Sequence, residues 1–346
     1  MIQSRSLQKP TVAVVGSGAA GLSAAWLLSR TCAVTLLEQS DKFGGHADTV
    51  QMRNGQPVDM GFIVYNEATY PNLSAWFTHL DVATQPTEMS FSVSRLAAGT
   101  AKPSHPPGEQ RRFEYAGGRR GGLLAQPANL LRPRFWSMLI DLVRFYHTAV
   151  AAVAKDSGGS EILTLGDFLR RQGYRRAFIE DHLLPFGAAI WSSSQAAMLD
   201  YPLAAFVRFC DNHGLLKLAN RPQWRTVSGG SKEYVSRVIQ DLDGEMLHLS
   251  HRVVRVQRPA VCSDDLLARR AKVTLADGEN LEFDHVVLAT HADQALALLD
   301  DADTDEQRLL GEFAYSSNVA VLHTDASVMP RSRSCLLYTS PSPRDS

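Results

Sequence analysis

The stretch that most constrains the fold lies near the amino terminus, where a β-branched apolar run leads into a cluster of glycines. Residues 11–15 read TVAVV, and Gly16, Gly18 and Gly21 follow with the spacing G-x-G-x-x-G. A stretch of good helix formers, LSAAWLLSR, comes directly after them. An apolar β-branched run is typical of a strand buried on both faces of a parallel sheet. The order of strand, glycine loop and helix therefore predicts the start of a βαβ unit.

The spacing of these glycines points to a phosphate ligand. Gly16 permits a tight turn, Gly18 lets main-chain N–H groups approach a pyrophosphate, and Gly21 lets the helix pack closely on its strand. The first helical residues, Ala19 and Ala20, join the predicted site, because the N–H groups and the dipole of a helix N-terminus favour negative charge. The loop is therefore predicted to bind a dinucleotide.

A second apolar run, residues 33–37, ends in Glu38. This carboxylate comes about 20 residues after the glycine loop, where an acid at the end of the second strand binds ribose hydroxyls. Glycine clusters also serve plain turns, but here strand, glycines, helix, strand and acid follow one another within the length of a βαβ unit. We therefore expect an α/β fold with a Rossmann-like domain, and Glu38 as the ribose ligand.

Composition narrows the class of protein. The chain has 346 residues, of which 45% are hydrophobic and 21% charged, as in a globular protein. A formal net charge of −1 argues against a nucleic-acid partner. The cysteines are far apart and show no zinc-site spacing, so we expect no metal. Because the chain shows neither a signal peptide nor a long uninterrupted apolar window, we expect a cytoplasmic protein, with peripheral contact to a membrane left open.

Two further glycine segments help to separate FAD from NAD. Gly44 and Gly45 lie in the stretch EQSDKFGGHADTV, and Asp59 and Gly61 lie in VDMGF. With these segments the chain resembles the FAD-dependent amine oxidase-like flavoproteins, which typically follow the ribose acid with G-G-R and then with D-x-G. His46 stands where these proteins usually have Arg, so a charge-assisted contact here depends on protonation.

A narrower resemblance rests on the stretches GGHADTV, VDMGFIVYNEATYPNL and PFGAAIWSSS. They are similar to a bacterial group of predicted FAD/NAD-binding oxidoreductases, often found beside cyclopropane-fatty-acid synthase. The resemblance implies FAD as the cofactor, a backbone contact of Val254 with its adenine side, and an approach of Thr290 to the cofactor. From the residues alone, Val254 and Thr290 can also be ordinary sheet residues.

The resemblance also implies a division into domains. The FAD-binding domain takes residues 1–61 and 224–300, and an inserted, mainly helical or mixed substrate domain takes residues 62–223 and 301–330. Tyr65, Asn66, His182 and Trp191 are expected to line a pocket, although aromatic packing explains them equally well. The resemblance assigns none of these residues a catalytic role.

Three segments of the inserted part have patterns of their own. Residues 133–155 mix aromatic, apolar and cationic side chains at helical spacing. This pattern favours a core-facing helix with a solvated edge, and a membrane-contacting helix is the alternative. Thr164, with Asp167 three residues later, predicts a helix start. Residues 97–122 are rich in Pro, Gly and Arg and are predicted to form a loop.

The last residues, 331–346, break with what precedes them. They read RSRSCLLYTSPSPRDS, offer no packed element and look like a translated sequencing adapter, so we expect an artefactual or disordered tail. Relatives continue with further substrate-domain elements and a segment that closes over the flavin. We therefore expect a truncated chain that binds FAD poorly and exposes apolar surface.

The sequence leaves three functions open. The first is an FAD-dependent oxidoreductase that removes hydride from an amine or, as the narrower resemblance favours, from an apolar or acyl-type substrate such as a lipid. The second is an NAD(P)-dependent dehydrogenase, which the Gly44-Gly45 pair and the Asp59-x-Gly61 pattern disfavour. The third is a non-catalytic module that binds a nucleotide or a lipid.

Overall fold

The computed structural model describes residues 9–96, 112–117, 122–155, 162–191, 193–217, 220–259, 270–315, 317 and 319–335. The chain forms two compact units, each assembled from separate segments. The first unit comprises Met1–Ile63, Ala75–Thr84 and Val227–Val321. The second unit comprises Val64–Ser74, Gln85–Thr226 and Leu322–Ser346.

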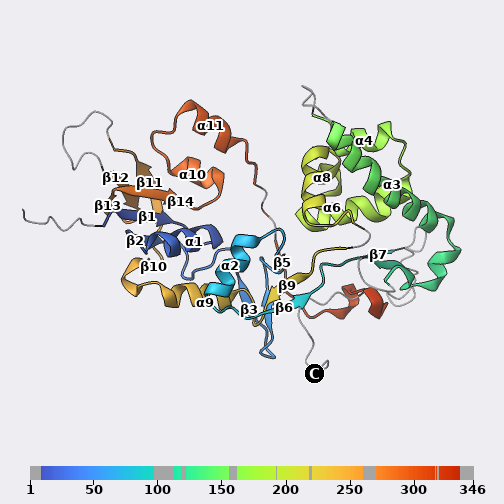
Figure 1. Ribbon diagram of the computed structural model, residues 1–346, viewed down its shortest axis with the longest axis horizontal. Coiled ribbons are helices and arrows are strands. Elements are labelled where there is room, and N and C mark those ends of the chain that lie inside the picture. The colour runs from blue at the N-terminus through green and yellow to red at the C-terminus, as the bar shows by residue number, and fades with distance from the viewer. Residues whose placement is uncertain are drawn as a thin grey trace, which may run out of the picture. The chain divides into compact units, whose positions relative to one another are not determined.

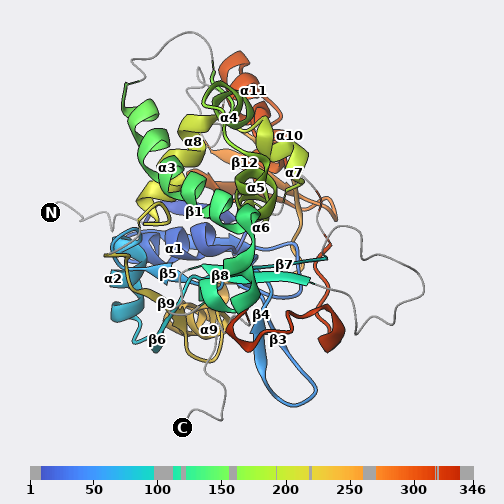
Figure 2. The same ribbon diagram turned by 90° about the vertical axis from the view of Figure 1, so that its right-hand side faces the viewer.

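A parallel sheet forms the centre of the first unit (Figure 1). Its strands run in the order β10 (Leu247–His248), β2 (Ala33–Leu37), β1 (Thr11–Val15) and β14 (His285–Leu288), and all neighbouring pairs are parallel. Helix α1 (Ala19–Leu28) connects β1 to β2 and packs on both strands, and it lies beside β1 in the second view as well (Figure 2). The predicted βαβ unit and the α/β fold are confirmed.

A second, antiparallel sheet packs against the first. Strands β11 (Val253–Gln257), β12 (Ala271–Leu275) and β13 (Asn280–Phe283) form it, and Gly278 turns the hairpin between β12 and β13 with φ +92°. Val273 and Phe283 of this sheet share a buried cluster with Ala13 and Leu37 of the parallel sheet. The remaining elements of the first unit are β3 (Thr49–Gln51), β4 (Pro57–Asp59), α9 (Lys232–Asp241), α10 (Ala292–Leu298) and α11 (Thr304–Gly311).

The structural division differs from the predicted domains at several places. Residues 75–84, which the sequence analysis gave to the substrate domain, cluster with the first unit, and residues 224–226, which it gave to the FAD-binding domain, cluster with the second. Residues 301–321, which the sequence analysis gave to the substrate domain, cluster with the first unit. The reason is helix α11, which packs on α10.

The second unit is mainly helical. Its helices are α3 (Pro133–Lys155), α4 (Leu165–Arg171), α5 (Arg176–Phe178), α6 (Leu184–Trp191), α7 (Gln195–Leu199) and α8 (Leu203–Asn212). Ile179–Leu183 form a π-helical turn between α5 and α6. Phe145, Phe178 and Phe206 lie in its buried core, each at most 1% exposed. As predicted, Thr164 caps α4, because its side chain accepts a hydrogen bond from the Asp167 N–H.

Short strands and turns complete the second unit. β5 (Tyr65–Asn66), β9 (Trp224–Val227) and β6 (Thr84–Thr87) form a sheet in the order β5-β9-β6. Helix α2 (Pro71–His79) follows β5, and its residues from Ala75 on cluster with the first unit. β7 (Phe91–Leu96) pairs with β8 (Arg112–Gly117). The loop prediction was therefore wrong for residues 112–117, while 97–111 and 118–121 lie outside the described residues. The expectation that residues 331–346 offer no packed element was wrong for 331–335, because the main-chain N–H groups of Arg331 and Ser332 bind Glu114 of β8 and Cys335 is 1% exposed. Residues 336–346 lie outside the described residues.

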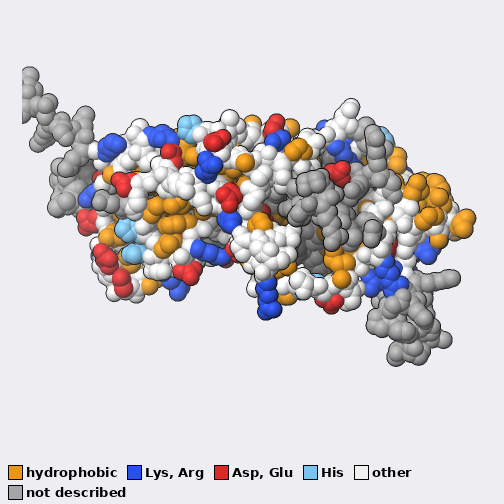
Figure 3. Space-filling view, turned by 90° about the horizontal axis from the view of Figure 1, so that it is seen from below, with side chains coloured by type: hydrophobic (Ala, Val, Ile, Leu, Met, Phe, Trp, Pro, Cys, Tyr) orange, Lys and Arg blue, Asp and Glu red, His pale blue; other side chains and the backbone are white. Residues whose placement is uncertain are grey.

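Helix α3 has two different faces. Phe135, Met138 and Phe145 are buried on one face, whereas Trp136 and Ile140 are about half exposed on the other. Within the described residues, α3 is the one helix long and apolar enough to cross a membrane, by length and composition only. Its buried face agrees with the core-facing interpretation, and contact of its exposed face with a membrane stays a prediction. Elsewhere on the surface, hydrophobic side chains gather in patches among charged ones (Figure 3).

Candidate functional site

Gly16 and Gly21 allow α1 to pack closely at the end of the parallel sheet. Gly16 has φ +95°, and a Cβ there would lie 2.9 Å from the carbonyl oxygen of Ala289. A Cβ at Gly21 would lie 1.8 Å from the carbonyl oxygen of Gly16, closer than real atoms approach. These two glycines are therefore needed by the fold itself, as the motif predicts for the turn and for the helix packing.

Packing within the protein does not require a glycine at position 18. It is the N-cap of α1 with φ −64°, and nothing among the described residues lies within 4 Å of a Cβ built there. Ala19 and Ala20, which follow it, are exposed. The start of α1 thus offers an open cradle lined by first-turn N–H groups, which have no intrahelical partners and favour an anion. A diphosphate fits this place.

Glu38 lies at the end of β2 beside the glycine loop and is 8% exposed. Its Oε2 accepts from the Ser17 N–H at 2.9 Å and from the Ser17 hydroxyl at 2.6 Å, and its Oε1 accepts from the Ser40 N–H at 2.9 Å. Burial alone would raise the pKa of Glu38, but these hydrogen bonds outweigh it and hold the pKa below its usual value. The carboxylate is thus ionised and oriented, and its hydroxyl partner can rotate away when a sugar hydroxyl arrives.

The segment with Gly44 and Gly45 lies directly on the glycine loop. Both residues have positive φ, +120° and +57°. The Gly44 N–H donates to the Ser17 carbonyl at 3.1 Å, and a Cβ at Gly45 would lie 3.0 Å from the Gly18 Cα. The Gly44-Gly45 segment, which we predicted to approach the cofactor with its backbone, therefore contacts the first glycine loop.

Asp59 and Gly61 hold neighbouring segments in place. Oδ1 of Asp59 accepts from the Thr49 hydroxyl at 2.6 Å and from the N–H and hydroxyl of Ser231, at 2.8 and 2.7 Å. A Cβ at Gly61 would lie 2.1 Å from the carbonyl oxygen of His46. In this structure both residues position the loops around the site, through contacts with protein groups.

Thr290 and Val254 lie in different places. Thr290 ends the stretch after β14, and its Cγ2 would be 3.3 Å from a Cβ at Gly16. Val254 lies in β11 of the antiparallel sheet, with its side chain 42% exposed and the register of the strand pair shifted around it. The structure therefore brings Thr290, but not the Val254 side chain, to the glycine loop.

Sequence reasoning missed two residues beside this loop. The His291 ring stacks on the His46 ring with centroids 5.6 Å apart and planes 11° apart. The Tyr315 ring stacks on the other side of His291, at 4.4 Å and 1°. The position of His291 directly after Thr290 is a signal that was available. Nothing in the sequence places Tyr315 there.

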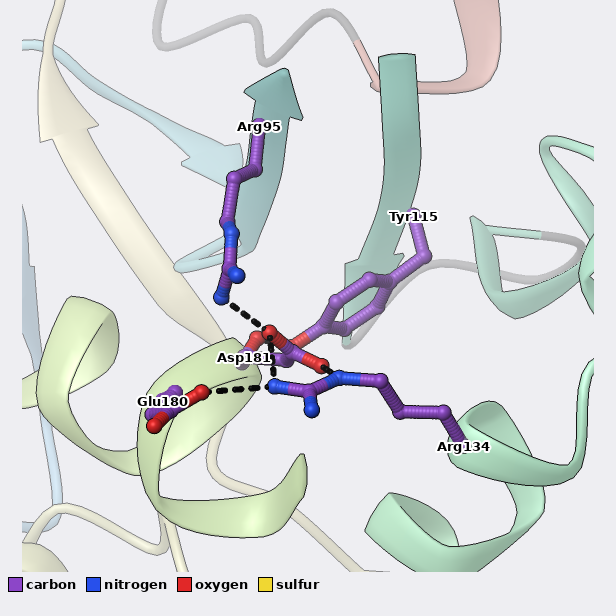
Figure 4. A network of polar contacts seen from close by, with 5 residues as sticks. All are labelled: Arg95, Tyr115, Arg134, Glu180 and Asp181. Carbon is purple, nitrogen blue, oxygen red and sulfur yellow. Dashed lines mark hydrogen bonds and ion pairs between the residues drawn. The ribbon is translucent and has the colours of Figure 1, made fainter. Parts of the chain in front are cut away.

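The second unit contains a polar cluster around the buried carboxylate of Asp181 (Figure 4). Asp181 is 5% exposed at its side chain and pairs with Arg95 and with Nε of Arg134, the latter at 2.6 Å. Arg134 also pairs with Glu180 at 2.7 Å, and the hydrogen bond to Asp181 raises the pKa of the guanidinium. The Tyr115 hydroxyl donates to the carbonyl of Asp181 at 2.7 Å. These contacts tie β7, β8, α3 and the π-helical turn together.

The residues predicted to line a pocket are packed among aromatic rings or in short strands. His182 stacks with Phe178 and Phe186, and its Nδ1 lies 2.9 Å from the Tyr115 hydroxyl. Burial lowers the pKa of His182 to about 4, so the ring is neutral at pH 7. Trp191 packs against Phe206 at 5.3 Å. Tyr65 and Asn66, which form β5, are buried.

Among the described residues, no group of three or more His, Cys, Asp or Glu side chains is placed to hold a metal ion.

Comparisons with known proteins place the fold. The chain matches a redesigned putrescine oxidase at 15% identity and a TM-score of 0.61, and cyclohexylamine oxidase from Brevibacterium oxydans IH-35A at 18% and 0.59. It also matches a CLA-producing fatty acid isomerase from P. acnes at 19% and 0.53. The matches cover 87–88% of this chain but 63% of each of those chains, so this chain spans less than two thirds of their length. At such identities the likeness concerns the fold.

The family assignment comes from the sequence. No curated protein matches the chain. The family model of flavin containing amine oxidoreductases, however, matches residues 19–345, which is most of the chain. The chain belongs to the family of flavin containing amine oxidoreductases.

Proposed function

We propose that the protein is an FAD-dependent oxidoreductase that acts on an apolar, acyl-type substrate. Family membership supports the flavin over a nicotinamide cofactor. In this proposal the N–H groups of Gly18, Ala19 and Ala20 bind the diphosphate, and Glu38 binds the ribose. The flavin, when bound, accepts the hydride of the substrate.

One observation carries the choice of substrate class: in the part of the second unit that the structure describes, the buried carboxylates are already engaged. Asp141, with a fully buried side chain, pairs with Arg175 at 2.9 Å and with Arg144 at 3.2 Å. Glu114, also fully buried, accepts from the main-chain N–H groups of Arg331 and Ser332. Asp181 is held by the arginines described above. A buried ammonium needs a carboxylate partner, whereas an acyl chain does not.

The surroundings of His182 support the same choice. His182 is uncharged at pH 7 because burial lowers its pKa to about 4, and it lies between phenyl rings. Surroundings of this kind favour an apolar chain over a cation. The fatty acid isomerase among the structural neighbours shows that the fold accommodates such chemistry in another protein.

The test is reduction of the flavin by substrate in the absence of oxygen. The protein is loaded with FAD, and the flavin absorbance is followed after addition of fatty acids, fatty acyl esters, putrescine or cyclohexylamine. We expect bleaching with an acyl compound and none with the two amines. Bleaching by an amine alone would overturn the substrate class, and failure to retain any flavin would overturn the proposal as a whole.

A further inference from the structure

We propose that the exposed face of α3, together with the two short turns before it, binds the surface of an anionic lipid bilayer. In this arrangement the helix lies along the bilayer and does not cross it. The inference goes beyond the proposed function, because it concerns the attachment of the chain to lipid and not the reaction.

The exposed face of α3 is apolar along most of its length. Between residues 136 and 154 the exposed positions recur every three or four residues, so they lie on one side of the helix. We call these six residues the α3 stripe: Trp136, Ile140, Val143, His147, Ala151 and Ala154. All of them except His147 are apolar, whereas the exposed side of an ordinary surface helix carries polar and charged residues. The α3 stripe is therefore suited to an apolar partner.

The opposite face of α3 belongs to the core of the second unit. Phe135, Met138, Asp141, Phe145 and Ala149 recur with the same spacing and are each at most 1% exposed. By length and composition α3 could cross a membrane, but it would have to leave this core to do so. A helix with one face buried in protein and the other face apolar can instead lie in the interface of a bilayer.

Two 3-10 turns extend the apolar surface at the start of α3. They are η1 (Gly122–Leu124) and η2 (Pro127–Leu131), and Leu131 is 86% exposed. The indole N–H of Trp136 donates to the carbonyl of Leu130 at 2.8 Å, which holds η2 beside the α3 stripe. Hydrophobic side chains gather at the right-hand side of Figure 3, with basic side chains next to them. Contiguous exposed apolar surface of this kind marks an interaction site.

The charges of the segment favour an anionic bilayer as the partner. Residues 122–155 contain four cations, Arg132, Arg134, Arg144 and Lys155, and one carboxylate, Asp141, which is fully buried. Arg132 lies between η2 and α3 with its guanidinium over the Phe113 ring, and the described residues give it no carboxylate partner. Basic side chains beside an apolar helix face are attracted to anionic head groups.

The same charges disfavour a second copy of the chain as the partner. In a two-fold dimer, each surface meets its own counterpart. Two copies paired through the α3 stripe would bring cations near cations, and the segment exposes no carboxylate to balance them. A lipid surface with phosphate head groups and acyl chains satisfies both the cations and the apolar side chains.

The experiment is sedimentation of the chain with lipid vesicles. One set of vesicles is made of phosphatidylcholine alone, and the other of equal parts of phosphatidylcholine and phosphatidylglycerol. We expect binding to the mixed vesicles to be about tenfold tighter than to the neutral ones, and to weaken as the salt concentration rises.

Two double variants test the apolar contribution. Trp136→Ser/Ile140→Ser should weaken binding to the mixed vesicles about tenfold or more, because less apolar surface is buried in the bilayer. The matched control is Leu309→Ser/Phe313→Ser in the first unit. These two side chains are 52% and 60% exposed, against 48% and 58% for Trp136 and Ile140, and their replacement should leave lipid binding unchanged.

Two single variants test the charge. Arg132→Glu should weaken binding to the mixed vesicles about tenfold and make the binding less sensitive to salt. Arg53→Glu is the matched control, because Arg53 is an exposed arginine in the turn between β3 and β4, and this variant should bind as the wild type does. Circular dichroism of each variant checks that it folds.

Trp136 also gives a direct signal of insertion, because it is the exposed one of the five tryptophans. Lipids that carry bromine on their acyl chains quench the fluorescence of an inserted indole. We expect them to quench the wild type. Trp136→Phe keeps the apolar surface, so it should still bind the mixed vesicles but lose this quenching.

Several results would overturn the inference. These are binding that does not distinguish the two kinds of vesicle, binding that is unchanged in Trp136→Ser/Ile140→Ser, and quenching that persists in Trp136→Phe. If the chain ignores vesicles and forms a dimer that Trp136→Ser/Ile140→Ser disrupts in analytical ultracentrifugation, the surface belongs to a second copy and the inference is wrong. If the double variant does not fold, the quenching of Trp136→Phe decides.

Discussion

Replacing Gly21 by Ala should damage the fold, whereas replacing Gly18 by Ala should damage only the site. A Cβ at Gly21 would lie 1.8 Å from the Gly16 carbonyl oxygen, a rigid main-chain atom, so α1 would have to move by more than an ångström. Overpacking of this kind costs about 3 kcal/mol. A Cβ at Gly18 meets nothing within 4 Å among the described residues, and φ −64° suits alanine. The free energy of unfolding of the Gly18→Ala variant should differ from that of the wild type by less than about 1 kcal/mol.

For cofactor affinity per folded molecule the order is reversed: Gly18→Ala should lose more affinity than Gly21→Ala. The Gly18→Ala methyl group occupies the cradle at the start of α1 and should cost about two charge-assisted hydrogen bonds, at roughly 1.5 kcal/mol each. This corresponds to an increase of about 100-fold in the Kd for FAD. Urea denaturation followed by circular dichroism gives the stability, and calorimetric titration gives the Kd.

The reasoning would be refuted by the reverse pattern. If Gly18→Ala unfolded the chain, the open cradle would not exist as described. If it bound FAD like the wild type, the diphosphate would lie elsewhere. A Gly21→Ala variant as stable as the wild type would contradict the close packing of α1.

Three further predictions concern carboxylates. Hydrogen bonds lower the pKa of Glu38 in the folded state, so its stabilising contribution is present above the usual pKa of 4.5 and is lost as the pH falls through the folded value. Glu38→Gln should therefore make the free energy of unfolding, measured with urea, less dependent on pH in this range. The same variant should weaken FAD binding about tenfold. Asp59→Asn should cost about 1–2 kcal/mol in urea denaturation by weakening the acceptor at the start of α9, while Asp81→Asn, at an exposed positive-φ position, should cost nothing measurable. Asp141→Asn should lower the unfolding free energy by about 2 kcal/mol, because the fully buried carboxylate that binds Arg175 and Arg144 loses its charge. Asp305→Asn, in an exposed pair, should change it by less than about 0.5 kcal/mol in the same assay.

The local parts of the site could be predicted because each has a short-range cause. The strand β1, the glycine turn and α1 follow one another in the sequence, and the acid at the end of β2 lies at a spacing that the βαβ unit itself sets. Glu38 and Gly18 were therefore found from spacing alone. Their partners, Ser17 and Ser40, were not, because serines near an acid have no distinctive pattern.

The parts that were missed depend on contacts between distant segments. The His291 and Tyr315 rings reach His46 only after β14 has paired with β1 and the chain has turned back through α10 and α11. The strand β8 was hidden because glycine and arginine surround it, although RFEYAG alternates in character. Asp59 was identified by motif, but its bonds to Ser231 come from a segment far along the chain.

The central claim is that a dinucleotide diphosphate lies against the main chain between Gly16 and Gly21, with its ribose at Glu38. Amide hydrogen exchange with and without saturating ADP-ribose tests this most directly. The account predicts slower exchange at the amides of Gly18, Ala19 and Ala20, and in the segment around Gly45. Ligand binding that leaves these amides exchanging as before, with protection elsewhere, would contradict it.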